Sequence, residues 1–347
     1  MPPNRSLLAL AGAAAGIGAG IVAEHSIVRR RRRNDPEGGE RFGTRRGVRP
    51  SRVPAGDGVD LSVEEAGPRS RRGAVFVHGS ALRTDVWHYQ IPGLGDHRLV
   101  FYDLRGHGFS DEKGEAEFSV ATLAQDLARV IDQTGLEEVV VVGHSLGGMV
   151  ALELALGRPE MLGDRLKGLV LANTTFGPAA ETLVGGALVA RLERVVRRPL
   201  DVLGSQHQRL ERLRNLVRAS DVVFWAVALA AFGPHPSAKQ VDFVYDMVAG
   251  TRAEVIFDLV RSYRAFDVRE RLGEITVPAL VLAGTHDRLT VPEASVFLAE
   301  HLPKAELTTF EGCGHMSMLE RHRQFNGCLT SFLNDVLGRP GRKERPR

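Results

Sequence analysis

The chain contains very little cysteine, with only Cys313 and Cys328 among its 347 residues. Two cysteines cannot form the disulfide framework of a small secreted domain, and they supply too few thiolates for a structural zinc site. A reducing compartment fits this composition, and so would a protein with unpaired thiols elsewhere. Hydrophobic residues make up 43% of the chain, which is long enough to bury a large core.

The central part of the chain lacks an excess of positive charge, although the sequence pI is near 9.1. Residues 1–72 contain 14 arginines against eight acidic residues, and residues 338–347 contain five basic residues against one. Residues 73–337 are therefore net acidic, with 33 acidic and 26 basic residues. Because nucleic-acid binding requires a basic face on the folded body, we expect no nucleic-acid partner. The basic ends are better suited to anionic lipid.

The segment Leu7–Ala23 has no charged residue and is at the short limit for a membrane-spanning helix. Only Arg5 precedes it, whereas Arg29–Arg33 follow it, which opposes translocation as a secretory signal. This asymmetry favours a membrane anchor within residues 1–33, with the rest of the chain on the cytoplasmic face of the membrane. A helix that lies on the membrane or packs on the protein, a cleaved signal, and a soluble cytoplasmic protein are the alternatives.

Beyond this segment we expect a flexible linker, because residues 34–52 are polar and contain glycine and proline. The folded body then alternates short apolar runs with helical patterns, which predicts a mostly parallel α/β sheet covered on both faces. The predicted strands are Val59–Glu65, Ala74–His78, Leu99–Tyr102, Val139–Val142, Leu169–Ala172, Ala279–Ala283 and Glu306–Phe310. The predicted helices are Val120–Gln133, Met149–Leu156, Pro292–His301 and Gln324–Leu337. Residues 338–347 form a basic tail that we expect to be disordered.

The alternation stops between Thr175 and Leu272, where no run typical of a buried strand occurs. We expect a helical cap over residues 176–272, inserted into a core made of residues 53–175 and 273–337. A separate helical domain fits less well, because the strand pattern resumes directly at Pro278. The predicted cap helices are Glu181–Val196, Gln206–Arg218, Val222–Ala231, Lys239–Val248 and Ala253–Tyr263.

The stretch Val139–Gly148, VVVVGHSLGG, predicts a strand, a sharp turn and the start of a helix. Within it, Gly143–Gly147 matches the G-x-S-x-G pattern of a nucleophile elbow, in which a strained turn holds the serine above the sheet. The bare pattern also occurs in ordinary glycine-rich turns. The strand before it and the helix after it favour Ser145 as a nucleophile.

An acid and an imidazole follow two later strands. Asp287 follows Ala279–Ala283, and His315 lies in the glycine-rich loop after Glu306–Phe310. Because the carboxyl ends of parallel strands meet at one edge of a sheet, both side chains can reach Ser145 there. A serine nucleophile needs a base and a group that orients the base, and the order Ser, Asp, His is the one this architecture uses. Each residue alone has ordinary structural explanations, but together they predict a triad.

Two backbone N–H groups are candidates for an oxyanion hole, which stabilises the negative charge that develops on the attacked carbonyl. One is the N–H of Leu146, at the start of the helix after the serine. The other is the N–H of Ser80, in the loop after the strand Ala74–His78. The Ser80 hydroxyl could assist in binding the oxyanion, and an ordinary polar role in the loop explains it equally well.

These motifs resemble those of the α/β-hydrolase-fold superfamily, and more narrowly its capped serine hydrolases of the esterase and lipase type. The resemblance covers about residues 59–337. It rests on His78-Gly79, the run DLRGHGFS at residues 103–110, Gly143–Gly148, Gly284–Asp287 and Gly314-His315. It implies an eight-stranded sheet, catalysis by Ser145, His315 and Asp287 without metal or cofactor, and a turn near the site shaped by residues 105–108.

The same resemblance narrows the reaction. Epoxide hydrolases and haloalkane dehalogenases carry an aspartate where this chain has Ser145. The position after the strand Leu169–Ala172 can carry an alternative acid, but this chain has Asn173 there. An amide cannot ionise, so Asp287 is left as the candidate acid. We therefore expect hydrolysis of a small lipophilic carboxylic ester, because the cap segment Val222–Phe232 is apolar.

Three residues are candidates for lining the substrate pocket: Met149, Met316 and Trp225. Packing in the core explains them about equally well. Perhydrolase or haloperoxidase-like activity and acyl transfer are alternatives on the same triad, and a non-catalytic ligand-binding protein of this fold is another. The sequence does not indicate the oligomeric state.

Overall fold

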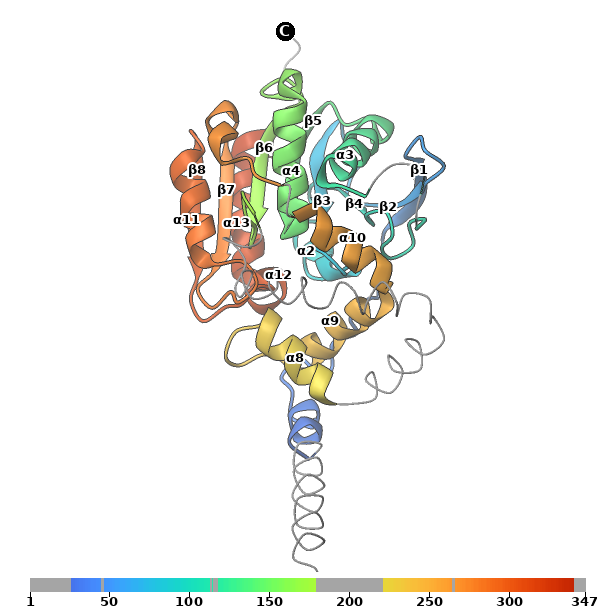
Figure 1. Ribbon diagram of the computed structural model, residues 1–347, viewed down its shortest axis with the longest axis vertical. Coiled ribbons are helices and arrows are strands. Elements are labelled where there is room, and N and C mark those ends of the chain that lie inside the picture. The colour runs from blue at the N-terminus through green and yellow to red at the C-terminus, as the bar shows by residue number, and fades with distance from the viewer. Residues whose placement is uncertain are drawn as a thin grey trace, which may run out of the picture.

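The computed structural model describes residues 26–44, 47–112, 114, 118–178, 221–263 and 266–339. The strands β1 to β8 span Arg49–Pro54, Asp60–Ala66, Arg72–Val77, Arg98–Tyr102, Glu138–His144, Leu166–Ala172, Ala279–Gly284 and Ala305–Phe310. They form one sheet in the order β1-β2-β4-β3-β5-β6-β7-β8 (Figure 1). Strand β2 pairs antiparallel with β1 and β4, and all other neighbours pair parallel. The predicted fold class, a mostly parallel eight-stranded α/β sheet, is confirmed.

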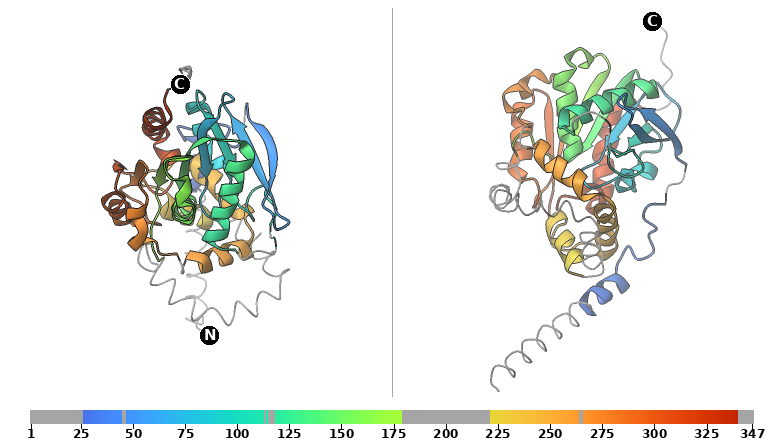
Figure 2. Two further views of the ribbon diagram at one scale, coloured as in Figure 1. Left: turned by 90° about the horizontal axis from the view of Figure 1, so that it is seen from above. Right: turned by 45° about the vertical axis from the view of Figure 1, so that its right-hand side comes forward.

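Helices cover both faces of the sheet (Figure 2). The α-helices are α2 (Gln90–Gly93), α3 (Val120–Thr134), α4 (Leu146–Gly157), α8 (Asp221–Ala231), α9 (Ala238–Gly250), α10 (Ala253–Tyr263), α11 (Pro292–His301), α12 (Ser317–Glu320) and α13 (His322–Leu337). Short 3-10 helices span Thr84–Trp87, Pro159–Met161 and Arg269–Glu274. Val139 and Val141 of β5 belong to the core with α3, α4 and α11, and Val140 and Val142 to the core with α13. Because alternate residues of a strand face opposite sides, a strand buried on both faces is a continuous apolar run.

The predicted strands agree with β2 to β8 to within three residues at each end. Strand β1 was not predicted, because its sequence RPSRVP contains Pro50 and Pro54 and lacks an apolar–polar alternation. Proline cannot donate a backbone hydrogen bond, so such a segment forms a strand only where one side needs no partner. The edge position of β1, next to β2 alone, meets this condition.

The region between β6 and β7 is helical where the structure describes it, and we call α8, α9 and α10 the inserted helices. They agree closely with the last three predicted helices of this region. The other two, Glu181–Val196 and Gln206–Arg218, lie outside the described residues. In Figure 1 the helices α8 and α9 lie below the sheet, on the side where the parallel strands end. A direct contact fixes this placement, because the Ala231 carbonyl of α8 accepts the backbone N–H of His315 at 2.9 Å.

Residues 34–44 pack on the inserted helices, whereas the sequence predicts a flexible linker over residues 34–52. The Asp35 carboxylate accepts the first two backbone N–H groups of α9 and thereby adds a second cap to that of the N-cap residue Ser237, which accepts the Gln240 N–H. The Phe42 ring stacks on Phe243 of the same helix, with 4.7 Å between ring centroids. These partners are about two hundred residues away in the sequence, so no local pattern reveals them.

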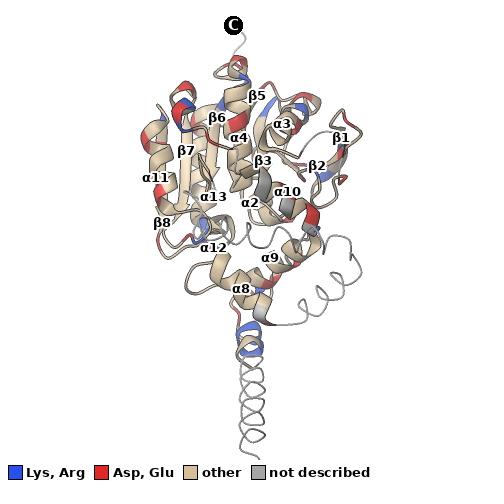
Figure 3. Ribbon diagram, in the orientation of Figure 1, with Lys and Arg blue, Asp and Glu red and all other residues tan. Residues whose placement is uncertain are grey.

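Residues 26–33 form a helix that lies beside α8, and Figure 3 shows the Lys and Arg positions of this helix in blue. Val28 is fully buried against the inserted helices. The Arg32 guanidinium pairs with Asp242 at 2.8 Å and lies 5.2 Å from the ring centroid of Phe224. Part of the arginine run is thus bound to the protein itself.

Within the described ranges, no helix has the length and the apolar character needed to cross a membrane. The predicted apolar segment Leu7–Ala23 and most of the predicted tail, residues 340–347, lie outside these ranges.

Candidate functional site

Ser145 occupies the turn between β5 and α4. Its backbone angles, φ 53° and ψ −119°, lie in a region that residues other than glycine rarely adopt. Two hydrogen bonds fix this turn: the Ser145 N–H donates to Ala172 at 3.0 Å, and the Thr174 hydroxyl donates to the Ser145 carbonyl at 2.6 Å. A conformation of this kind costs on the order of 1–3 kcal/mol and persists only where its surroundings enforce it.

The glycines around Ser145 are required because backbone atoms approach them closely. A Cβ atom on Gly147 would collide with the Val77 carbonyl, and one on Gly143 would collide with Gly147. A Cβ atom on Gly79 would lie 3.0 Å from the Ser145 Cβ. The loop after β3 and the start of α4 therefore pack directly against Ser145, which the motif spacing alone could not show.

Asp287 and His315 are in contact, as their positions at the ends of β7 and β8 predict. The His315 Nδ1 lies 2.9 Å from the Asp287 Oδ2, and both residues are buried. Since the carboxylate accepts, Nδ1 carries the proton and Nε2 is left as the basic nitrogen. The geometry is that of an acid that orients an imidazole.

The Asp287 carboxylate is held by four further donors. Oδ1 accepts the backbone N–H groups of Leu289 and Thr290, and Oδ2 accepts the Thr290 hydroxyl and the Asn173 amide at 2.7 and 2.9 Å. Burial alone would raise the pKa of Asp287, but His315 and these hydrogen bonds lower it to about 2. Asp287 is therefore ionised throughout the neutral range.

Two side chains hold the loop that carries His315. The His144 Nε2 lies 2.9 Å from the His315 carbonyl and donates to it. Burial lowers the pKa of His144 well below its ordinary value, so this ring is neutral. The Glu320 carboxylate accepts the N–H of Gly314 at 2.9 Å and that of Gly233 at 2.8 Å, which ties the loop to the end of the inserted helix α8.

Two neutral histidines shape the loop after β3. The His78 Nδ1 donates to the Gly79 carbonyl at 2.8 Å, and its Nε2 accepts the Leu104 N–H at 3.0 Å. The His107 Nε2 accepts the N–H of Ala81, the residue after Ser80, at 3.1 Å. Burial lowers the pKa of His78 to about 4 and that of His107 to about 3, so both keep an acceptor nitrogen at neutral pH.

The two candidate oxyanion donors border this arrangement. Leu146 is the first residue of α4, where helix N–H groups have no partner within the helix. Ser80 lies between Gly79 and Ala81, and Ala81 has a positive φ of 57°. Among the described residues, no backbone or side-chain acceptor is hydrogen-bonded to the N–H of Leu146 or Ser80.

The turn after β4, residues 103–110, is anchored by a buried arginine, in line with its expected structural role. Arg105 donates to both oxygens of Asp126 on α3, at 2.7 and 2.8 Å, and to Asp57 at 2.8 Å. Arg105 and Asp126 are only 2% and 1% exposed. The Arg105 carbonyl in turn accepts the Nδ1 proton of His107 at 2.9 Å, which links this ion cluster to the loop after β3.

The three pocket candidates have packing contacts. Met149 on α4 and Met316 are both buried, each in one of the two apolar cores. Trp225 on α8 is half-buried, makes an edge contact with Phe224 and lies 4.9 Å from the Arg31 guanidinium. A role for these residues in binding substrate stays a prediction.

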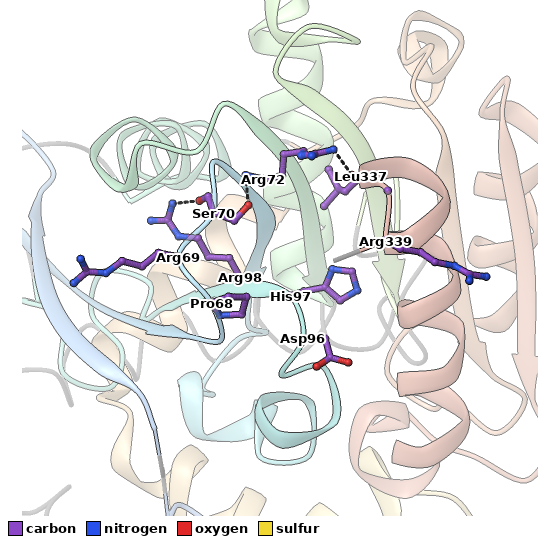
Figure 4. A pocket seen from close by; sticks show the side chains of 10 residues that line it. Pro68, Arg69, Ser70, Arg72, Asp96, His97, Arg98, Leu337 and Arg339 are labelled. Carbon is purple, nitrogen blue, oxygen red and sulfur yellow. Dashed lines mark hydrogen bonds between the residues drawn. The ribbon is translucent and has the colours of Figure 1, made fainter. Parts of the chain in front are cut away.

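A cavity of about 240 Å³ lies at the end of the sheet away from Ser145, where β3 and β4 begin and α13 ends (Figure 4). Two arginines lining it are engaged by the protein itself. Arg98 donates to the carbonyls of Ser70 and Thr134 at 2.6 and 2.7 Å, and Arg72 donates to the Leu337 carbonyl at 2.9 Å. This cavity is separate from the Ser145 site. Within the described ranges, no group of three His, Cys, Asp or Glu side chains is placed to hold a metal ion.

The structure also gives three residues of this site contacts that the sequence did not indicate. Thr290 follows Asp287 by three residues, a spacing at which an aspartate commonly accepts hydrogen bonds from the backbone and side chain ahead of it. His107 lies in a recognised run, but its contact with Ala81 spans 26 residues and has no local signal. Asn173 was noted only because it cannot ionise, and its contact with Asp287 required the three-dimensional structure.

A mostly parallel sheet of this order, with a serine at a strained strand–helix turn, is the arrangement of α/β-fold hydrolases. The sequence matches the alpha/beta hydrolase fold family over residues 75–322, and the chain belongs to that family. It is therefore a hydrolase of the α/β fold.

Relatives of this chain are named for several hydrolytic activities. A proposed carbamate hydrolase from Variovorax paradoxus is 31% identical over 283 residues, which cover 80% of this chain and 97% of that protein. The 3-oxoadipate enol-lactonase 1 of Acinetobacter baylyi is 25% identical and covers 80% of this chain and 95% of its own length. The crystal structure of a proposed aryl esterase from Burkholderia cenocepacia is 27% identical with a TM-score of 0.66, and covers 84% of this chain and all of that one.

Proposed function

We propose that this protein is a serine hydrolase that cleaves a carboxylic ester through Ser145, His315 and Asp287. The observation that carries the proposal is the contact between His315 and Asp287 in a loop that is itself hydrogen-bonded to His144, the neighbour of Ser145. The strained backbone at Ser145 supports it, because strain of this kind is typical of functional sites.

In the proposed reaction, His315 Nε2 takes the proton of the Ser145 hydroxyl as the Ser145 oxygen attacks the ester carbonyl. Asp287, ionised at neutral pH, holds the His315 tautomer and stabilises the imidazolium that forms. The imidazolium then protonates the leaving alcohol, and an acyl-enzyme remains on Ser145. Water, activated by His315, releases the acid and restores the serine.

The N–H groups of Leu146 and Ser80 would stabilise the tetrahedral oxyanion. Two features support this assignment: Leu146 stands at a helix N-terminus, and His107 holds the residue that follows Ser80. Loss of one such donor lowers kcat by about a hundredfold or more in enzymes of this kind.

For the substrate, we infer a lipophilic ester bound beneath the inserted helices, which would act as the cap. The apolar composition of α8 supports this, and so does its contact with the loop of His315. The carbamate, lactone and aryl ester in the names of the relatives share an acyl carbonyl next to a heteroatom, which is the group that this chemistry attacks.

Labelling with a fluorophosphonate tests the nucleophile. We expect one adduct on Ser145, none in Ser145→Ala, and full labelling of Ser331→Ala, a control at an exposed position of α13. Absence of an adduct on folded wild-type protein would refute the proposal. A series of p-nitrophenyl esters of increasing chain length then measures the acyl preference, and we expect kcat/KM to rise with chain length.

The same assays separate the other activities of a serine triad. Tight ligand binding without turnover would indicate a binding protein. Halogenation that depends on acetate and peroxide would indicate a perhydrolase, and transfer to an added alcohol in place of water would indicate an acyltransferase.

We also propose that residues 7–33 attach the protein to the cytoplasmic face of a membrane. The uncharged segment 7–23 and the arginine run that follows it support this. Because residues 26–33 contact the inserted helices, the test should remove residues 2–24 only. We expect the full chain in the membrane fraction and the shortened chain in the supernatant; a full chain found only in the supernatant would refute the proposal.

A further inference from the structure

We propose that Asn173 is a positioning residue of the Ser145 site, which fixes the Asp287 carboxylate and the His315 loop to each other. The inference rests on the proposed function, since it assigns a role within that triad. Asn173 lies directly after β6, between β5, which leads to Ser145, and β7, which leads to Asp287, and it is 1% exposed.

The Asn173 amide connects three parts of the site. Its Nδ2 donates to the Asp287 Oδ2 at 2.9 Å, the same oxygen that accepts His315. It also lies 3.3 Å from the carbonyl of Gly314, the residue before His315. Its Oδ1 accepts the hydroxyl of Ser317, at the start of α12. One amide therefore contacts the acid, the loop of the base and the helix that follows this loop.

The Ser317 contact determines which way the amide faces. A serine hydroxyl that donates to Oδ1 leaves Nδ2, which has two protons, directed at the two acceptors Asp287 and Gly314. A carboxylate at position 173 could not replace it without a proton, because two negative charges about 3 Å apart do not both ionise in a buried site. An aliphatic side chain would leave these acceptors without a donor.

The backbone also suits asparagine at this position. Asn173 has a positive φ of 47°, and asparagine adopts this left-handed region more readily than most residues. Its N–H donates to the Leu282 carbonyl of β7 at 2.8 Å, so the backbone is held by the same strand that leads to Asp287. Asn173 does not carry the reacting atoms, and we expect it to act on the rate through Asp287 and His315.

The first test deletes the amide without straining the backbone. In Asn173→Gly, we expect kcat to fall about ten- to hundredfold, the usual contribution of one hydrogen bond to a charged group, with little change in KM. The matched control is Thr175→Val, two residues further along. Thr175 is 2% exposed, and its hydroxyl has no hydrogen-bond partner among the described residues, so this change should leave kcat unaltered.

The second test replaces the amide by a nearly identical shape. In Asn173→Asp, the new carboxylate and Asp287 would share one proton, so their pair would titrate well above the usual range of a carboxyl group. At a pH below the pKa of this pair, the protonated acid donates a hydrogen bond as the amide does, and kcat should be close to that of the wild type. Above it the donor is lost, and kcat should fall to the level of Asn173→Gly. The wild type should lack this ionisation, and a purely structural role would not produce it.

Ser317→Ala provides a third variant in case the changes at position 173 prevent folding. It frees the amide to rotate, and we expect a smaller loss of kcat in the same direction, with a somewhat lower melting temperature because the buried Asn173 Oδ1 loses its donor. The inference is overturned if Asn173→Gly or Ser317→Ala folds and keeps the wild-type kcat, if Asn173→Asp keeps the wild-type pH profile, or if Thr175→Val loses as much activity as Asn173→Gly.

Wild-type protein separates this inference from the proposed function. A wild type that hydrolyses esters and is labelled on Ser145, together with a fully active Asn173→Gly, contradicts only the role of Asn173. A wild type that is neither labelled nor active contradicts both.

Discussion

Replacement of Arg105 by methionine should destabilise the fold more than most single changes. Arg105 and Asp126 are almost completely buried, and two hydrogen bonds of 2.7 and 2.8 Å join them. Methionine keeps much of the volume but leaves the Asp126 carboxylate buried without its partner. Breaking a buried ion pair from one side costs about 3–5 kcal/mol, a large part of the free energy of unfolding of a typical domain.

The double variant Arg105→Met/Asp126→Leu should be more stable than Arg105→Met. Removing both charges also removes the cost of burying them, and apolar replacements of a buried pair are often neutral. Asp57, the third member of the cluster, is 17% exposed and can be hydrated once Arg105 is gone. We expect the double variant to recover at least about 2 kcal/mol of the loss.

The pH dependence of Arg105→Met gives a second signature. Burial already raises the pKa of Asp126, and Arg105 opposes this shift, so the variant should have a still higher folded-state pKa. An acid whose folded pKa is raised loses stability as pH rises through its titration range. The variant should therefore be less stable at pH 8 than at pH 5. This loss of unfolding free energy between the two pH values should be larger in the variant than in the wild type.

Urea unfolding followed by circular dichroism, at pH 5 and pH 8, measures these differences. The control is Arg271→Met, which breaks an exposed ion pair with Glu274 and should leave the midpoint unchanged. The reasoning fails if Arg105→Met loses less than about 1 kcal/mol, or if the double variant is no more stable than the single one.

Three further changes have defined outcomes. The pKa of Asp287 falls from its ordinary value of 3.8 to about 2 on folding, which stabilises the protein by about 2 kcal/mol above pH 4. Acid titration should show this stability lost as the pH falls from about 4 to 2 in the wild type but not in Asp287→Asn. Asp35→Ala removes the acceptor of the first two N–H groups of α9, while Ser237 still accepts the Gln240 N–H, and it should lower the free energy of unfolding by about 1 kcal/mol; an unchanged melting temperature would contradict this contribution of Asp35. Gly147→Ala should prevent correct folding, because the new Cβ atom would collide with a carbonyl oxygen of β3, and the protein should become sensitive to proteases. Gly157→Ala in the same helix should be tolerated because, among the described residues, no atom outside its own stretch of chain lies within 4 Å of its new Cβ.

The sheet could be predicted because its parallel strands are buried on both faces. Each appears in the sequence as a short apolar run, and Val139–Val142 is the clearest case. The proximity of Asp287 and His315 followed from the same fact, since strands that run parallel end at one edge. The chemical roles of these two residues and of Ser145 are predictions that the experiments above test.

The parts that could not be predicted depend on partners far along the chain. Strand β1 has no apolar alternation and owes its existence to β2. Asp35 and Phe42 lie in a polar, glycine-containing stretch that is typical of a linker. Their positions are fixed by contacts with α9, which is far away in the sequence. Asn173 has no charge and no motif, and its importance depends on the three groups that its amide meets.

The cap that Asp35 places on α9 has a consequence for the order in which the chain assembles during synthesis. Asp35 and Ser237 are 202 residues apart, and a ribosome adds roughly 5–20 residues each second. Asp35 thus leaves the ribosome roughly 10–40 s before the helix that it caps. During this interval Asp35 and Phe42 cannot make their contacts with α9, whereas the strands β1 to β6, which lie between them in the sequence, have already been synthesised. Residues 34–44 therefore remain without these partners until six of the eight strands have been synthesised.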